Sequence, residues 1–122
     1  GAEVVIADID LPEAETVATA VRAATGRGVA MKVDISSDAA VAAFADSLGS
    51  RFGRCDILVN NAAILDTTPI DQLTMERYRR VADINLDGAI RMSIGAVPLL
   101  RQAGPERRPP EREAQEREGR VP

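Results

Sequence analysis

Side chains able to carry out proton transfer or nucleophilic attack are scarce in this sequence. There is one cysteine, Cys55, and no histidine, which excludes zinc sites built from Cys and His and any Ser-His or Cys-His catalytic pair. The single tyrosine, Tyr78, and the single lysine, Lys32, lie far apart, so no Tyr and Lys stand one helical turn apart. Carboxylates and amides therefore remain as the candidate functional groups, and we predict no metal site.

These carboxylates and amides follow short apolar runs or interrupt them. Asp8 ends the run Val4–Ala7, Asp34 ends a second run, and Asn61 closely follows a third. Asn85 instead lies within a long apolar stretch, where a buried amide needs a hydrogen-bond partner. The apolar runs are thus the elements that must position the candidate groups.

The apolar runs alternate with helical patterns. Continuous runs at 3–8 and 56–59 predict strands buried on both faces, and the alternating run 29–33 predicts a strand at a sheet edge. Two helices are predicted between them, one starting after a cap at Asp10 and one capped by a serine before Val41. Their expected apolar faces are Ala14, Val17, Ala18, Val21 and Ala24 in the first, and Val41, Phe44, Ala45, Leu48 and Phe52 in the second.

A third helix is predicted from about Met75 to about Leu100, with Thr74 as its cap. Its apolar residues point in most directions, which indicates a helix covered on more than one side, inside a large protein or at a subunit interface. This pattern fits a homo-oligomer formed through the helix, and it fits equally a core face of the helix that is left exposed. Because strand and helix alternate three times, the predicted fold class is α/β with a parallel sheet.

Charge and composition limit the partners. The 15 basic and 19 acidic residues give a net charge of −4, which argues against a nucleic-acid partner. No apolar run approaches the roughly 20 residues that span a bilayer, and no signal-peptide pattern opens the sequence, so we expect a cytoplasmic protein without membrane contact. Residues 103–122 are rich in Pro, Arg and Glu, which predicts a disordered or partly helical tail after a domain at 1–102. The tail is either a genuine extension or the product of a reading frame lost after Gly104.

The ordered set of motifs resembles the short-chain dehydrogenase/reductase family over about residues 1–102. Asn60-Asn61-Ala62-Ala63, directly after the third predicted strand, is similar to the family's Asn-Asn-Ala-Gly motif, with Ala63 in place of glycine. The resemblance implies a partial Rossmann fold, a doubly wound parallel sheet of which these residues supply a βαβαβα part. Three further residues stand in the family's order: Asp8, Asp34 and Asn85.

The resemblance also implies a nicotinamide cofactor. Asp8, with Ile9 beside it, would accept hydrogen bonds from the adenosine ribose hydroxyls and repel a 2′-phosphate, so NAD is expected over NADP. Asp34 resembles the family aspartate that meets the adenine ring, and Ile35 would form part of that pocket. Without the resemblance, an Asp34 that only forms a turn is an equally good interpretation.

Further residues resemble the nicotinamide side of the family's cleft. Asn61, Ala62 and Ala63 are similar to the segment beneath the nicotinamide ribose, where small residues let the backbone approach the cofactor. Asn85 resembles the helix asparagine of the catalytic tetrad, which holds a water for proton relay. The implied reaction is hydride transfer between the nicotinamide ring and a small-molecule alcohol or ketone.

Two parts of the family's machinery are not among these 122 residues. The glycine-rich loop comes with a first strand and helix that would precede Gly1, and the catalytic serine and Tyr-x-x-x-Lys would follow the long helix. Because the Rossmann strand order is 3-2-1-4, that first strand would lie between the first and third strands predicted here. We therefore expect no turnover from this chain alone. The alternatives are a non-catalytic module that binds adenosine or pairs a strand with another chain, and a flavodoxin-like α/β domain that mimics the motifs.

Overall fold

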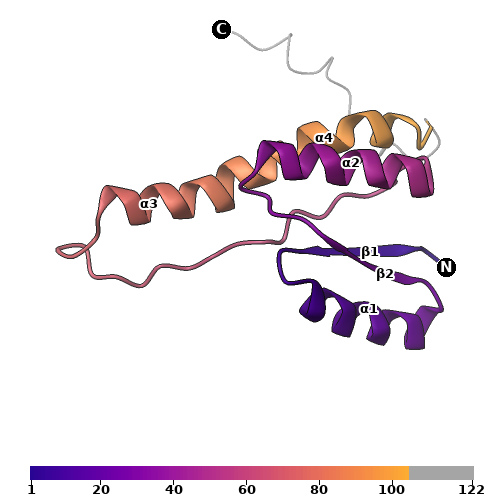
Figure 1. Ribbon diagram of the computed structural model, residues 1–122, viewed down its shortest axis with the longest axis horizontal. Helices are drawn as coiled ribbons and strands as arrows, with labels where there is room; N and C mark the ends of the chain where they lie inside the picture. The colour runs from indigo at the N-terminus through magenta and orange to yellow at the C-terminus, as the bar shows by residue number, and fades with distance from the viewer. Residues whose placement is uncertain (105–122) are drawn as a thin grey trace, which may run out of the picture.

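The computed structural model describes residues 1–104, which form an α/β body from which a long helical rod extends (Figure 1). A strand, helix, strand unit comes first, followed by a helix, a long connection without regular structure, and three consecutive helical segments. The bounds are β1 (Val4–Asp8), α1 (Leu11–Thr25), β2 (Gly28–Lys32), α2 (Asp38–Phe52), α3 (Met75–Ala82), the π-helix η1 (Asp83–Gly88) and α4 (Ala89–Arg101).

The sheet of the described residues consists of two parallel strands, β1 and β2. They pair residue by residue, from Val4 opposite Gly28 to Asp8 opposite Lys32. Both were predicted as strands, and their parallel pairing through a crossover helix is the βαβ arrangement of an α/β protein. Their carboxyl ends therefore meet at one edge of the sheet.

Helix α1 covers one face of this sheet. The side chain of Asp10 accepts a hydrogen bond from a backbone N–H of its first turn, and Gly26 ends it with a left-handed φ of 80°. Ala14 and Ala18 are buried against the strands. Val17, predicted on the same apolar face, is instead 49% exposed, because a sheet of two strands is too narrow to cover the whole face.

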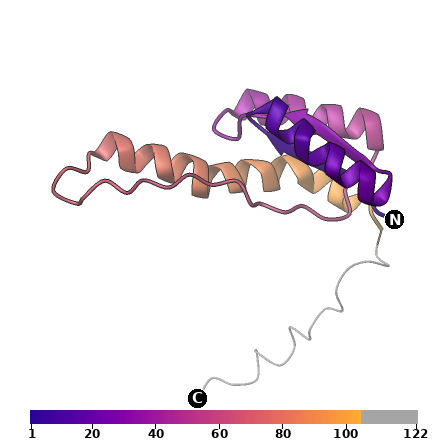
Figure 2. The same cartoon turned by 90° about the horizontal axis from the view of Figure 1, so that it is seen from below.

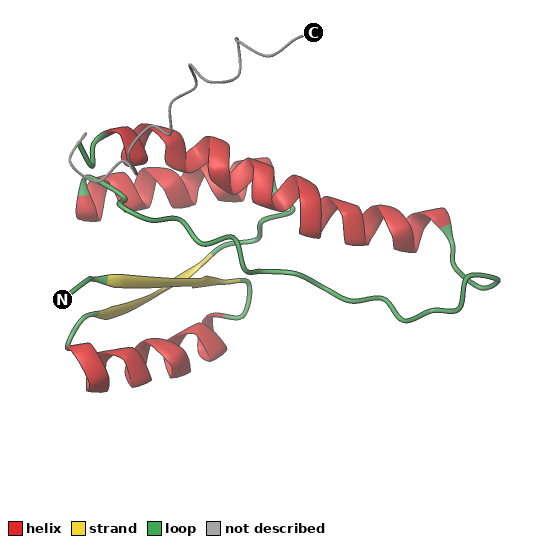
Figure 3. Cartoon of the chain, turned by 180° about the vertical axis from the view of Figure 1, so that it is seen from behind, coloured by secondary structure: helices red, strands yellow, loops and turns green. Residues whose placement is uncertain are grey.

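Helices α2 and α4 lie together on the opposite face, so the body has three layers (Figures 1 and 3). The apolar core is between the sheet and α2, where Val33, Val41 and Phe44 are buried together. Gly95 of α4 lies against α2, since a Cβ at this position would be 3.3 Å from Val41 Cγ1. Covering both faces of a parallel sheet is the doubly wound arrangement.

The rod is the continuous helical stretch formed by α3, η1 and α4, and it agrees with the helix predicted from about Met75 to about Leu100. Thr74 caps it by accepting a hydrogen bond from the backbone N–H of Arg77. Its α3 end projects beyond the body, and the connection between α2 and α3 runs alongside it (Figures 1 and 2). The middle of the rod is π-helical, which the apolar pattern of the helix did not predict.

The third predicted strand, at 56–59, is not formed. Ile57 and Val59 have no strand partner among the described residues and are 79% and 74% exposed. A strand exists only when a neighbouring strand satisfies its backbone groups. Within residues 1–104 the sheet has only the strands β1 and β2, so the prediction of a strand at 56–59 was wrong.

No helix within residues 1–104 combines the length and the hydropathy needed to cross a membrane. The tail expected over 103–122 lies, from residue 105 onward, outside the described residues. The domain boundary after residue 102 stays a prediction.

Candidate functional site

The carboxyl ends of β1 and β2 bring the first candidate residues together. The carbonyl oxygen of Asp8 accepts a hydrogen bond from Val33 N at 2.9 Å, and Asp34 follows directly. The exposed Asp8 carboxylate accepts from Asp10 N at 2.9 Å through Oδ1. Both predicted acids therefore stand at the same sheet edge, where open α/β sheets bind their ligands. Ile9 lies in the turn after Asp8 and is 59% exposed.

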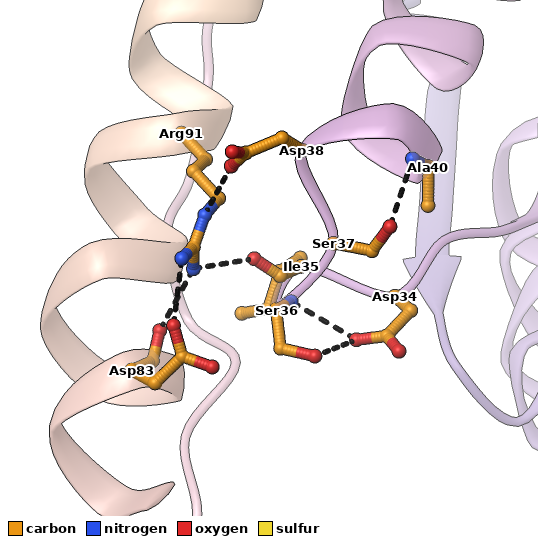
Figure 4. A network of polar contacts seen from close by, with 8 residues as sticks. All are labelled: Asp34, Ile35, Ser36, Ser37, Asp38, Ala40, Asp83 and Arg91. Carbon is orange, nitrogen blue, oxygen red and sulfur yellow. Dashed lines mark hydrogen bonds and ion pairs between the residues drawn. The ribbon is translucent and has the colours of Figure 1, made fainter. Parts of the chain in front are cut away.

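Asp34 forms a tight turn with Ser36 (Figure 4). Its Oδ1 accepts from Ser36 Oγ at 2.6 Å and from Ser36 N at 2.9 Å. These two hydrogen bonds, with a smaller contribution from the charge of Arg91, lower the pKa of Asp34 below its ordinary value. Ser37 then caps α2 by accepting from Ala40 N at 3.2 Å. The turn is thus fixed locally at both ends.

Ile35 contacts the rod at a point where any side chain larger than that of glycine would displace it. A Cβ on the buried Gly88 would lie 2.7 Å from Ile35 Cδ1 and 2.9 Å from its Cγ1. Gly88 is the last residue of η1, the segment that also contains Asn85. The segment after β2 and the turn that carries Asn85 are therefore in direct contact.

Asn85 uses both ends of its amide on one backbone residue. Its Oδ1 accepts from Ile64 N at 2.8 Å, and its Nδ2 donates to the Ile64 carbonyl oxygen at 2.8 Å. The need for a hydrogen-bond partner was predicted, but the burial was not correct, because the segment around Ile64 covers Asn85 only in part and the residue is exposed. The amide fixes the connection just after the Asn-Asn-Ala-Ala motif.

The motif itself runs along the rod. Asn60 Nδ2 donates to Ser93 Oγ at 3.1 Å and to the Ala89 carbonyl oxygen at 3.4 Å. The three predicted site residues that follow, Asn61, Ala62 and Ala63, are exposed. Sequence reasoning missed Ser93 and treated Asn60 only as part of the motif; the adjacent Asn-Asn pair was the available signal.

A line of contacts links most of the candidate residues. It runs from Asp8 through the pairing with Val33 to Asp34 and Ile35, across Gly88 to Asn85, and from there to Ile64. Asn61–Ala63 lies just before Ile64 along the chain, and Ile9, directly after Asp8, is exposed.

A hollow of about 400 Å³ opens beside the Ile64 segment, lined in part by Asp66, Arg77 and Arg80. Asp66 accepts hydrogen bonds from Arg77 Nε at 2.8 Å and Nη2 at 3.1 Å. These bonds, together with those from Thr68, hold the pKa of the Asp66 carboxyl far below its ordinary value. The hollow is thus lined by the Asp66–Arg77 ion pair together with the side chain of Arg80.

Neither Tyr78 nor Lys32 joins this arrangement. Tyr78 is 54% exposed on α3, where it lines an apolar hollow of about 440 Å³ with Ile70, Leu73 and Met75. Lys32 is exposed at the end of β2. The described site can therefore bind through carboxylate, amide and backbone groups, and it holds no Tyr and Lys pair for proton transfer.

Comparison with known proteins agrees with these features. A family model described as enoyl-(acyl carrier protein) reductase matches residues 1–105. The galactitol 2-dehydrogenase of Agrobacterium fabrum is 43% identical over 106 residues, which are 85% of this chain and 40% of that protein. The sorbitol dehydrogenase of Cereibacter sphaeroides is 39% identical over 92 residues, 75% of this chain and 35% of that protein.

Solved structures show the same similarity. The L-sorbose reductase of Gluconobacter frateurii, complexed with NADPH and L-sorbose, is 28% identical with a TM-score of 0.77. The match covers 85% of this chain and 40% of that one. A metagenomic short-chain oxidoreductase in complex with NADP is 29% identical with a TM-score of 0.76, over 84% of this chain and 47% of that one. The chain thus spans less than half the length of these relatives, and it belongs to the short-chain dehydrogenase/reductase family.

Proposed function

We propose that this chain forms the adenosine side of the cofactor cleft of an NAD(P)-dependent oxidoreductase. In the whole enzyme, hydride would pass between the nicotinamide ring and a small-molecule alcohol or ketone. The observation that carries the proposal is the line of contacts from Asp8 through Asp34, Ile35 and Gly88 to Asn85. It lies at the carboxyl ends of parallel strands, the usual ligand position in this class of sheet.

The residue roles follow from the chemistry of each group. Asp8 would accept from the ribose hydroxyls through the carboxylate oxygen that Asp10 does not engage. Asp34 and Ile35 would contact adenine, with the Asp34 turn already fixed by Ser36. Asn61–Ala63 would run under the nicotinamide ribose, since its exposed small residues leave the backbone accessible.

NAD is proposed over NADP as the cofactor of the whole enzyme. The reason is electrostatic: the Asp8 carboxylate would stand at the ribose position, where it would repel a 2′-phosphate. The two solved relatives above were bound to NADPH and NADP, so the cofactor class is shared while the preference rests on Asp8 alone.

Calorimetric titration of the 122-residue chain with adenosine 5′-monophosphate tests the adenosine site. We expect a dissociation constant on the order of millimolar, because the pyrophosphate and nicotinamide contacts are not available. Asp8→Ala should abolish binding, whereas Asp71→Ala, an exposed acid in the connection to α3, should leave it unchanged. Absence of binding to the parent chain, or equal binding by both variants, would contradict the proposal.

The same titration with adenosine 2′,5′-bisphosphate tests the cofactor preference. The parent chain should bind this compound more weakly than the monophosphate, because of the added charge near Asp8. Asp8→Ser should narrow the difference, since the repelling carboxylate is removed. A parent chain that prefers the bisphosphate would overturn the NAD assignment and leave the adenosine site intact.

The isolated chain is proposed to have no turnover. Its only tyrosine and lysine are on separate elements, and Asn85 is the single proposed member of the catalytic set. The named functions of the relatives make polyols the first substrates to assay. NADH formation from galactitol or sorbitol by the purified chain, free of host enzymes, would refute the proposal. A cytoplasmic location, no nucleic-acid partner and a homo-oligomer through the rod are proposed for the whole protein.

A second candidate function is a strand-pairing module. It is favoured by the 79% and 74% exposure of Ile57 and Val59, and by a β1 edge that has no partner within residues 1–104. If this chain recruits a strand from another chain, replacing Val59 by Asp should weaken that association without loosening the β1–β2 pairing. An unchanged sedimentation profile for Val59→Asp would dismiss this candidate.

A further inference from the structure

Arg91 of α4 makes the most extensive set of polar contacts in the neighbourhood of the site (Figure 4). Its Nε donates to Asp38 Oδ1 at 2.6 Å, and its Nη1 donates to the Ile35 carbonyl oxygen at 3.3 Å. Toward the rod, Nη1 and Nη2 donate to the carbonyl oxygen and Oδ1 of Asp83 at 3.1 and 2.7 Å. One planar group thus contacts two segments that lie far apart in the sequence.

The two segments are the ones that carry the proposed cofactor contacts. Residues 34–38 contain the Asp34 turn and Ile35, and Asp83 begins the π-helix that contains Asn85. Within residues 1–104, two hydrogen bonds join residues 34–38 to the rod. Arg91 donates both of them, one to Asp38 and one to Ile35. From Asn85 the linkage continues through its amide to Ile64.

Stabilisation of the fold by ion pairs does not explain why Arg91 makes this set of contacts. The Asp38 side chain is 88% exposed and that of Asp83 is 40% exposed, and solvated ion pairs contribute little to stability. The contacts to two backbone carbonyl oxygens are different, because they fix the position of the main chain in both segments. The guanidinium plane can satisfy all of these acceptors at once, which a lysine ammonium on its flexible stem cannot.

We propose that Arg91 is a positioning residue that sets the adenine-side turn at 34–38 in register with the Asn85 segment. Through this link the connection at Ile64 responds to what binds at the turn. The assignment of the two ends to adenine and nicotinamide rests on the proposed function, whereas the link itself does not.

Amide hydrogen exchange without any ligand tests the link. Ser36 N and Ile64 N are reporters, since each donates to a side chain at one end of the linkage. Arg91→Met should accelerate exchange at both amides by about tenfold or more, the size expected for losing a hydrogen bond to a charged group. Arg77→Met removes a comparable Arg–Asp pair from the same rod and should leave Ser36 unchanged. Exchange within about twofold of the parent at both reporters in Arg91→Met would overturn the proposal.

Two milder variants keep the test decisive if Arg91→Met does not fold. Asp38→Ala changes an exposed side chain and removes one acceptor, so it should accelerate exchange at Ser36 more than at Ile64. Arg91→Lys keeps the positive charge but loses the planar set of N–H donors, so it should accelerate exchange at both reporters. If both variants match the parent chain, the proposal is wrong.

Titration with adenosine 5′-monophosphate, followed by amide NMR shifts, tests transmission. This probe carries no nicotinamide, so it should shift Ser36 directly and Ile64 only through Arg91. In Arg91→Met the shift at Ser36 should remain and that at Ile64 should disappear. An Ile64 shift that is absent from the parent, or survives in the variant, overturns transmission. If the amide signals of Asp8 and Ser36 do not shift in the parent chain, the proposed adenosine site is wrong. The hydrogen-exchange data then test the Arg91 link by themselves.

Discussion

At the scale of single residues, Gly88 shows how little space separates the rod from the segment after β2. A Cβ would lie 2.7 Å from Ile35 Cδ1, closer than side-chain atoms pack without displacement. We expect Gly88→Ala to destabilise the chain by about 1–2 kcal/mol, since overpacking costs about 1–3 and the helix gains up to about 1 from alanine. Urea unfolding measures the change.

Gly49→Ala is the matched control, because a Cβ there would meet only Leu99 Cδ2, at 3.4 Å. It should be neutral or stabilising by up to about 1 kcal/mol, as expected for replacing a glycine within a helix. Shortening the neighbour in the double variant Gly88→Ala with Ile35→Val should recover part of the loss. Equal effects of the two glycine substitutions would contradict the close approach of Ile35.

Asp66 predicts a specific dependence of stability on pH. Arg77 and Thr68 lower the pKa of its carboxyl in the folded chain relative to the ordinary value of 3.8. A lowered folded-state pKa means that ionised Asp66 stabilises the fold above about pH 4, and that this contribution is lost as the pH falls below about 4. The parent chain should therefore lose stability more steeply than Asp66→Asn below this pH.

Urea midpoints measured at a series of pH values from neutral to acidic test this expectation. Asp71→Asn is the control, because no hydrogen bond to the Asp71 side chain is present in the described part of the chain. It should follow the parent profile. Asp34 is retained in all three proteins, so the difference between the profiles isolates Asp66. Parallel acid profiles for parent and Asp66→Asn would show that the Arg77 pair does not persist in solution.

At the scale of elements, the π-helix η1 and the connection 54–74 depend on each other. Asn85 holds Ile64 by two hydrogen bonds, and Arg77 holds Asp66 two residues further on. An extended connection has no ladder of its own, so these side chains fix its path along the rod. The rod is thus the support on which the Asn-Asn-Ala-Ala motif is held.

Asn85→Ala tests this dependence. Loss of both amide contacts should accelerate hydrogen exchange at Ile64 by about tenfold, in keeping with a net hydrogen bond of about 1 kcal/mol or slightly more. Asn85→Asp can still accept from Ile64 N but cannot donate to its carbonyl oxygen, so its effect should be smaller. A faster exchange in the aspartate than in the alanine variant would exclude the observed bidentate contact.

At the scale of the whole molecule, one side of the rod is apolar and exposed. Leu86, Ile90 and Ile94 are 60%, 50% and 68% exposed, and they recur every four residues. Side chains at this spacing lie on one face of a helix. Large exposed apolar surfaces favour association, so we predict that the chain forms oligomers through this face.

Sedimentation velocity at several concentrations measures this association. Ile94→Glu places a charge at the most exposed of these three residues and should shift the population to monomer. Ile70→Glu changes an apolar residue of 86% exposure in the connection, away from the face, and should leave association unchanged. If Ile70→Glu disperses the oligomers and Ile94→Glu does not, the contact lies at the α3 tip instead.

Local signals in the sequence identified β1, β2, the caps Asp10 and Thr74, a serine cap for α2, and the full extent of the rod, because caps and apolar periodicity act over a few residues. Asp8 and Asp34 were likewise predictable as neighbours, since parallel strands bring their carboxyl ends to one edge. The failed strand at 56–59 marks the limit of such signals. A strand needs a neighbour, and the apolar pattern of Ile57–Val59 says nothing about whether one is present.

Which distant groups meet depends on how the helices and strands pack. Ile35 and Gly88 touch, Asn85 holds Ile64, and Arg91 bridges Asp38 and Asp83. These contacts join residues that have no fixed spacing in the chain, so no periodicity or cap reports them. They arise because α4 packs beside α2 on one face of the sheet. This packing places Arg91, which in the sequence is indistinguishable from a surface charge, between the two halves of the proposed cofactor cleft.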